Sequence, residues 1–236
     1  MKKLSLVLIA LVIAAGSNAQ KINDPNVQVR EAKNFHAINV SNSFDVYLSQ
    51  SNEEAVAVSA DETKHRDRIK VEVKDGVLYV KYDNEGKIGW SSGNKKLKAY
   101  ISFKQIDKLT ASGACDVFIE GTIKSEELVI HQSGACDLKG KVDVKRLSVD
   151  LSGASDMTIS GNASQLSIEV SGASDFKGFE LVTDICDAKA SGASDIKITV
   201  NKELSAQASG ASDVRYKGNG VVRDLKSSGS SSVSKG

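Results

Sequence analysis

A five-residue motif recurs through the second half of the chain at nearly constant intervals. It reads Ser-Gly-Ala-Cys-Asp in its first two copies and Ser-Gly-Ala-Ser-Asp in the next four, and a degenerate seventh copy reads Ser-Gly-Ser-Ser-Ser. The copies begin at Ser112, Ser133, Ser152, Ser171, Ser191, Ser209 and Ser228, so the intervals are 21, 19, 19, 20, 18 and 19 residues. Repeats of such a period are typical of solenoids, in which each repeat forms one coil that is stable only when stacked on its neighbours.

Apolar and polar residues alternate between the motifs, which indicates extended chain with one buried face. A helix would instead place apolar residues three and four positions apart. In the coil around Ser152, the inward parity carries Leu147, Val149, Leu151, Gly153, Ser155, Met157 and Ile159. We therefore expect the glycine and the fourth residue of each motif to form narrow inward-facing rungs, and the aspartate to face outward.

The short repeat and the strand periodicity together predict an all-β protein, a parallel β-helix with about one coil per 19-residue repeat. Turns are expected at Gly161-Asn162 and Gly218-Asn219-Gly220. A β-propeller is the alternative, but its blades need about 40 residues. The composition favours the solenoid, because one proline and 5% aromatic residues suit a regular ladder of small and aliphatic side chains.

The first twenty residues have the pattern of a secretory signal peptide. Two lysines precede an apolar stretch at residues 4–15, and Ser17-Asn18-Ala19 supplies the small residues of a cleavage site. The stretch is too short to span a bilayer. We expect residues 1–19 to be removed from an exported protein that is periplasmic, on the outer surface or secreted, without membrane insertion.

The mature chain divides into two parts. Residues 20–110 are predicted to form irregular β coils, or a cap, continuous with the solenoid, and residues 111–236 are predicted to form the regular repeats with a C-terminal tail. A separately folded N-terminal β-domain is the alternative.

Four local features stand out in the first part. Residues 41–46 resemble a degenerate repeat with Asp45 in the acidic position. Asp75-Gly76 predicts a hairpin turn. Residues 61–68 are expected to form a short helix or a loop, and residues 84–96, which include Trp90, a protruding loop.

Stacking of the coils would align the motif aspartates in one outward column. Its members are Asp116, Asp137, Asp156, Asp175, Asp195 and Asp213. Neighbours about 4.8 Å apart repel by roughly 1 kcal/mol in water before screening. Basic residues two positions further on offset this repulsion as diagonal neighbours, namely Lys139, Lys177, Lys197 and Arg215.

Cys115 and Cys136 occupy the same motif position in successive coils. Their Cα atoms would then lie one coil rise apart, inside the usual disulfide range. Stacked Cβ vectors do not by themselves give disulfide geometry, so we expect either a bridge or two stacked inward thiols. Cys186 falls at an inward apolar position and is interpreted as a small buried side chain.

The sequence resembles the family of putative auto-transporter adhesins known as the head GIN domain. The likeness runs from about residue 30 to residue 232 and is carried by Arg30, Phe35, Ile38, Val40, Asp45-Val46, Asp75-Gly76-x-Leu78 and the serial S-G-A-S-D copies. The resemblance implies a right-handed β-helix and export. It brings no catalytic residues with it.

The formal net charge of +1, from 31 basic and 30 acidic residues, gives no reason to expect a nucleic acid partner. We interpret the chain as a non-catalytic binding module, adhesin-like and in the envelope or on the surface, that engages a glycan, another protein or its own copies. The expected ligand contacts are Trp90, whose ring can stack on a sugar, and the six outward aspartates. We assign no catalytic, cofactor or metal-binding residues.

Two other functions stay open at this stage. Pectin-degrading enzymes also use parallel β-helices, and carboxylates one or two coils apart overlap the separations found in glycosidases. The six aspartates occupy equivalent positions, however, whereas acid–base catalysis needs carboxyl groups in unlike environments. A purely structural envelope role is the other alternative. Calcium binding by the aspartate column is disfavoured, because strands beside lysines offer too few oxygen ligands.

Overall fold

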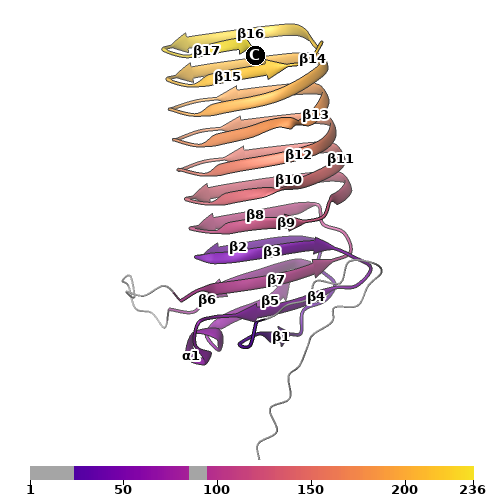
Figure 1. The fold of residues 1–236 in the computed structure, drawn as a ribbon, viewed down its shortest axis with the longest axis vertical. Helices are drawn as coiled ribbons and strands as arrows, with labels where there is room; N and C mark the ends of the chain where they lie inside the picture. The colour runs from indigo at the N-terminus through magenta and orange to yellow at the C-terminus, as the bar shows by residue number, and fades with distance from the viewer. Residues whose placement is uncertain (1–23, 85–94) are drawn as a thin grey trace, which may run out of the picture.

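The computed structural model describes residues 24–84 and 95–236, which form a tall stack of β-coils (Figure 1). The predicted signal peptide and Trp90 lie outside the described residues. The first part contains β1 (Gln28–Arg30), β2 (Ala37–Asn42), β3 (Phe44–Gln50), β4 (Ala55–Ser59), α1 (Thr63–Arg66), β5 (Ile69–Lys74), β6 (Val77–Tyr82), β7 (Leu97–Phe103), β8 (Lys108–Gly113) and β9 (Asp116–Glu120). The second part contains β10 (Ile123–Gly134), β11 (Asp137–Leu151), β12 (Asp156–Val170), β13 (Asp175–Ala190), β14 (Asp195–Gly210), β15 (Asp213–Lys217), β16 (Val221–Gly229) and β17 (Ser232–Lys235).

Successive repeats stack as parallel, in-register strands, which confirms the predicted solenoid. Asp156 of β12 pairs with Asp137 of β11 on one side and with Asp175 of β13 on the other. Each regular coil has two long sides. We call the side that begins with the motif aspartate the Asp side, and the side that leads back to the next motif the opposite side. The motif forms a tight turn at one end of the coil, the turn end, and a wider corner joins the two sides at the other, the corner end (Figure 1).

The tight turn corrects one expectation about the motif. Gly153 does not face the core: it is exposed, with φ +83°, and a Cβ atom on it would lie 2.4 Å from the carbonyl oxygen of Gly134 in the previous coil. That carbonyl accepts a hydrogen bond from the backbone N–H of Ala154 at 2.7 Å. Glycine is needed there because the left-handed backbone and the close stacking of turns both exclude a side chain.

The fourth motif residue faces inward, as predicted. Ser155 is buried, and its hydroxyl donates to the carbonyl oxygen of Ser152 at 3.1 Å while accepting from the backbone N–H of Cys136 at 3.3 Å. The hydroxyl therefore closes its own turn and also ties it to the coil below. A buried backbone N–H that the strand ladder does not use is satisfied in this way.

The predicted corners also lie near their glycines. In the coil of β12, Gly161 has φ +107°, and the two consecutive exposed residues Ser164 and Gln165 interrupt the alternation. The segment 218–220, with Gly218 at φ +96°, turns the chain from β15 into β16.

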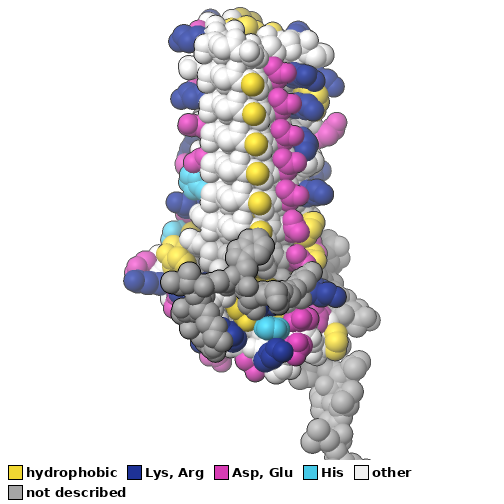
Figure 2. Space-filling view, turned by 90° about the vertical axis from the view of Figure 1, so that its left-hand side faces the viewer, with side chains coloured by type: hydrophobic (Ala, Val, Ile, Leu, Met, Phe, Trp, Pro, Cys, Tyr) yellow, Lys and Arg dark blue, Asp and Glu magenta, His cyan; other side chains and the backbone are white. Residues whose placement is uncertain are grey.

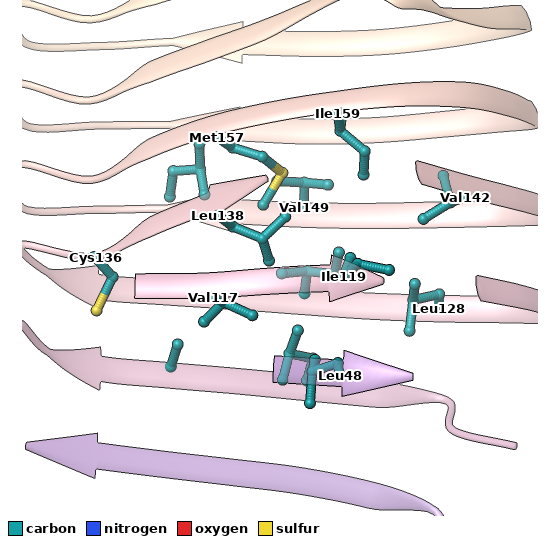
Figure 3. Packing of buried hydrophobic residues seen from close by; sticks show 14 of the residues in the cluster. Leu48, Val117, Ile119, Leu128, Cys136, Leu138, Val142, Val149, Met157 and Ile159 are labelled. Atoms are coloured by element: carbon teal, nitrogen blue, oxygen red, sulfur yellow. The ribbon is translucent and has the colours of Figure 1, made fainter. Parts of the chain in front are cut away.

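One hydrophobic cluster of buried residues runs through the described part of the chain, from Ala32 to Val214. Leu138 and Met157 from the Asp side and Val149 from the opposite side point into the same interior (Figure 3). The core thins toward the C-terminal end, because one inward column reads Leu151, Val170, Ala190 and Ala208 in successive coils.

The first part is less regular than the repeats. The coil formed by β2 and β3 is not the end of the stack, since it lies between two other levels: β2 pairs in parallel with both β6 and β8, and β3 with both β7 and β9. Below it, β4 pairs antiparallel with β1 and β7, and β5 with β6. The chain therefore leaves the stack after β3, forms this end of the rod, and returns above its first coil.

Three local predictions for this part are confirmed. Asn42 pairs with Gly113 and Asp45 with Asp116, so residues 41–46 do form a degenerate repeat. The hairpin between β5 and β6 turns at Asp75-Gly76. The excursion at residues 61–68 contains α1. Residues 85–94 of the predicted loop lie outside the described residues.

Candidate functional site

The aspartate column exists and is one residue longer than predicted. Asp45 stands in register with Asp116, and the column ends where Ser232 pairs with Asp213. Seen from the turn end, acidic side chains line up beside a straight stripe of small turn residues, with basic side chains next to them (Figure 2). All six predicted aspartates are therefore brought together along one face. The S-x-x-x-D pattern at residues 41–45 was the signal for the seventh.

The basic residues offset the column unevenly. Lys177 bonds Asp156 at 2.7 Å and approaches Asp175 at 3.5 Å, and Arg215 approaches Asp213 at 3.4 Å. Within the described ranges, Lys139 and Lys197 form no ion pair shorter than 4.0 Å. The charge of Lys139 nevertheless acts on Asp116 of the previous coil, where it opposes the rise in pKa. The expectation that basic residues offset the column is therefore confirmed for Lys139, Lys177 and Arg215, and for Lys197 it stays a prediction.

The two ends of the column differ in electrostatics. Partial burial, with the charges of Asp45 and Asp137, raises the pKa of Asp116. A hydrogen bond from Ser232 at 2.7 Å, with Arg215 nearby, lowers the pKa of Asp213. These two carboxyl groups are five coil steps apart, or about 24 Å. That distance is far too long for a pair of glycosidase carboxyl groups.

An aromatic stack that the sequence analysis missed continues the basic column toward the N-terminal end. The ring of Tyr47 lies 5.1 Å from that of Tyr100 and 5.3 Å from that of Phe118, with interplanar angles of 14° and 21°. Both faces of Tyr47 are therefore covered by neighbouring rings, so this ring offers no free face to a ligand. Alignment of residues 41–47 with 112–118 would have placed Tyr47 over Phe118, whereas nothing in the sequence pointed to Tyr100.

A groove of about 340 Å³ lies on the Asp side near the corner end. It is lined by residues of four successive coils, namely Lys139, Gly140, Thr158, Ile159, Ser160, Lys177, Phe179, Glu180 and Lys197. The 20-residue interval after Ser171 was the sequence signal for it, because the extra residue lies in this wall. Pockets of this volume are at the small end of those that hold ligands in proteins.

Cys115 and Cys136 are both buried and free in the structure. They stack as predicted for equivalent positions, with the backbone N–H of Cys115 3.4 Å from the Sγ atom of Cys136, which lies at the turn end of the core (Figure 3). A hydrogen bond with Cys136, together with burial, raises the pKa of Cys115. Each thiol also donates to the first serine carbonyl of its own motif, at 3.4 and 3.3 Å, which is the role that serine takes in later coils.

Histidines and metal-binding groups lie elsewhere. His36 pairs with Asp107 at 3.0 Å and His131 with Asp150 at 3.4 Å. In the described part of the chain, three potential ligand atoms come within 4.8 Å of one another only at Asp61 and Glu62, which precede α1, and His65, which lies within it. The aspartate column brings no such trio together, since its members stand in single file beside lysines and an arginine.

Trp90, the predicted aromatic contact, lies outside the described residues. Across residues 24–84 and 95–236, no helix has the length and apolar character needed to cross a membrane.

Comparison with known proteins gives a consistent result. The family described as "Putative auto-transporter adhesin, head GIN domain" matches residues 34–220. No curated protein matches the chain. Among solved structures, a putative adhesin from Bacteroides fragilis is similar with a TM-score of 0.79 at 22% identity, over 89% of this chain and 95% of that chain.

Two further solved structures are similar over 89% of this chain. One is a putative adhesin from Parabacteroides merdae, with a TM-score of 0.69, 20% identity and 95% of that chain covered. The other is described as a putative lipid binding protein from Parabacteroides distasonis, with a TM-score of 0.68, 21% identity and 97% of that chain covered. At these identities the likeness shows a shared fold.

Proposed function

This chain belongs to the head GIN domain family of putative auto-transporter adhesins, and we propose that it is an exported, non-catalytic binding module that engages a glycan through its Asp side. The observation that carries the proposal is the in-register column from Asp45 to Asp213, with basic side chains beside it. It presents carboxylates and ammonium groups at a repeat of about 4.8 Å over roughly 30 Å. Such a face can form several equivalent hydrogen bonds to a repeating polymer, and several weak contacts made at once give a higher affinity than any one of them.

Several properties of this face support binding over catalysis. The motif aspartates occupy equivalent positions in successive coils, and the two with opposite pKa shifts, Asp116 and Asp213, are about 24 Å apart. A hydrolase of the two-carboxylate kind needs unlike carboxyl groups within about 10 Å. A column of equivalent side chains instead suits a ligand that is itself periodic.

A glycan screen with residues 20–236 tests the proposal. We expect binding of at least one oligosaccharide, with an affinity changed tenfold or more in the double variant Asp156→Asn, Asp175→Asn. The affinity falls if the aspartates accept hydrogen bonds from the ligand, and it rises if their charges repel an acidic ligand. The matched control is Asp187→Asn, an exposed aspartate on the opposite side, which should bind as the parent does. Trp90→Ala tests the predicted aromatic contact in the same assay.

Three results would count against this function. Equal loss of binding in the control variant would show that the ligand does not bind specifically to the Asp side. Release of shortened products from polygalacturonate, abolished by Asp156→Asn, would make the protein an enzyme. If no glycan binds but a protein partner is captured through the same aspartates, the ligand is a protein and not a glycan.

A further inference from the structure

The groove on the Asp side arises from a local break in the repeat. Between Ser155 and the corner, the coil of β12 is one residue shorter than the coil of β13. Thr158 pairs with Lys177 and Gly161 with Leu181, so two residues of β12 face the three residues 178–180 of β13. The extra residue makes Phe179 and Glu180 part of a wall beside the short side chains of β12.

Short and long side chains give the groove its shape. Thr158 and Ser160 of β12 are short, whereas Lys139 of the coil before and Lys177 and Phe179 of the coil after are long. The half-buried ring of Phe179 gives the wall an apolar character, whereas the side chain of Ile159 points into the core (Figure 3). The ammonium group of Lys217 lies 4.2 Å from the centroid of the Phe179 ring and covers one face of it, so a sugar ring would stack on the other face.

The rim of the groove carries more positive than negative charge. Three lysines and one glutamate line it. Lys177 is held by Asp156 and Asp175, whereas Lys139 and Lys197, among the described residues, have no ion pair within 4.0 Å. Neither ammonium group is held in a short ion pair with a described residue, although the charge of Lys139 also acts on Asp116 of the aspartate column. The two groups stand three coil steps apart, about 14 Å along the rod.

An acidic oligosaccharide matches these features. The apolar face of a pyranose ring can lie against an aromatic ring, its hydroxyl groups can bond Thr158 and Ser160, and its carboxylate can pair with a free lysine. One coil rise is close to the length that each ring adds to an extended oligosaccharide, so successive rings would meet successive coils. The groove's length fits a chain of about three rings.

We propose that this groove binds short oligosaccharides of hexuronic acid that lie along the rod axis, with Lys139 and Lys197 pairing with carboxylates and Phe179 stacking on a ring. The proposal rests on the glycan-binding function given above and names its ligand class. Pairing between exposed charges is weakened by salt, so affinity falls as ionic strength rises.

Calorimetry with trigalacturonate as the probe tests the proposal, with the neutral galactose trimer of the same linkage as the comparison ligand. We expect the acidic trimer to bind and the neutral trimer to bind at least tenfold more weakly. The double variant Lys139→Gln, Lys197→Gln should lose tenfold or more in affinity for the acidic trimer. Phe179→Leu, which keeps an apolar side chain but removes the flat ring, should weaken both trimers alike.

The control is Lys189→Gln, because Lys189 is an exposed lysine on the opposite side of the same coil as Phe179. Thermal unfolding of every variant separates lost contacts from lost folding: the lysine variants should unfold at the parent temperature. Equal binding of both trimers, or equal loss in the control variant, would overturn the proposal. If trigalacturonate does not bind while another glycan binds through the Asp side, this inference fails and the proposed function stands. If no glycan binds, both fail.

Discussion

The two ends of each coil follow different rules. At the turn end, the motif is nearly invariant: equivalent glycines carry left-handed φ angles in seven successive turns, and Ala154 and its equivalents bond the turn below at 2.7 to 2.9 Å. At the corner end, length and chemistry vary. In the regular coils, the register shifts fall near the corners, between Thr158 and Gly161 of β12, between Gly178 and Val182 and between Thr183 and Ile185 of β13, and between Leu204 and Ser205 of β14.

This contrast explains how the spacing can vary between 18 and 21 residues without loss of the stack. A strand that slips by one residue turns all its side chains to the other face. The turn end cannot absorb such a slip, because the strand that follows the turn begins at once with alternating inward and outward side chains. The corner can, because the alternation is already interrupted there. New surface features, such as the groove beside Phe179, therefore arise at the corner end.

The largest difference between the ends should appear on insertion of a single residue. An alanine inserted between Ala154 and Ser155 should lower the free energy of unfolding by more than about 4 kcal/mol, since it moves the buried Ser155 out of register. The same insertion between Ser160 and Gly161 should cost less than about 1.5 kcal/mol, because the next coil already carries an extra residue there. Urea unfolding followed by circular dichroism measures both. Equal costs would refute the contrast.

A glycine pair should show a smaller difference. Gly153→Ala should cost about 2–4 kcal/mol, from left-handed strain and from contact with the Gly134 carbonyl oxygen. Gly121 joins β9 to β10 with a similar φ of +80°, but a Cβ atom on it would meet nothing within 4 Å. Gly121→Ala should therefore cost only the strain, about 1 kcal/mol. The same unfolding assay shows whether the close stacking of turns, in addition to the left-handed φ angle, makes glycine necessary at position 153.

The smallest effect should come from removing the charge of one motif aspartate, the first residue after the turn. The two ends of the aspartate column differ in the direction in which the pKa is shifted. The pKa of Asp116 is raised, so its ionisation above the ordinary value of 3.8 disfavours the folded state. Asp116→Asn should then stabilise the protein at neutral pH, by less than about 0.5 kcal/mol because the group is exposed and screened. The gain should vanish as the pH falls below the ordinary aspartate value.

Asp213 should behave in the opposite way. Its pKa is lowered, so its charge stabilises the folded state at neutral pH, and this contribution is lost as the pH falls through the lowered value. Asp213→Asn should therefore be slightly destabilising at pH 7 and neutral in strong acid. Unfolding curves between pH 2 and pH 7 measure both variants, and identical curves would show that the column is electrostatically uniform.

Much of the candidate site could be predicted because it repeats. The aspartate column, the lysines beside it and the inward Ser155 all follow from register and parity. The aromatic stack could be predicted only in part, since Tyr100 of β7 reaches Tyr47 through a pairing that no repeat encodes. The groove could not be located from the sequence, because the 20-residue interval after Ser171 reveals an extra residue but not where in the coil it is accommodated.

The sequence by itself determined the coil, its register and the columns of equivalent side chains, because a repeated motif brings the same hydrogen bonds and the same alternation to every coil. Only the tertiary structure decided where the motif glycine lies, since Gly153 faces solvent in a tight turn although its parity matches the core. It alone also placed the coil of β2 and β3 between β6–β7 and β8–β9. The physical reason is that many non-repeated strands can pair with one another, and the choice among them depends on how their side chains pack together in the whole core.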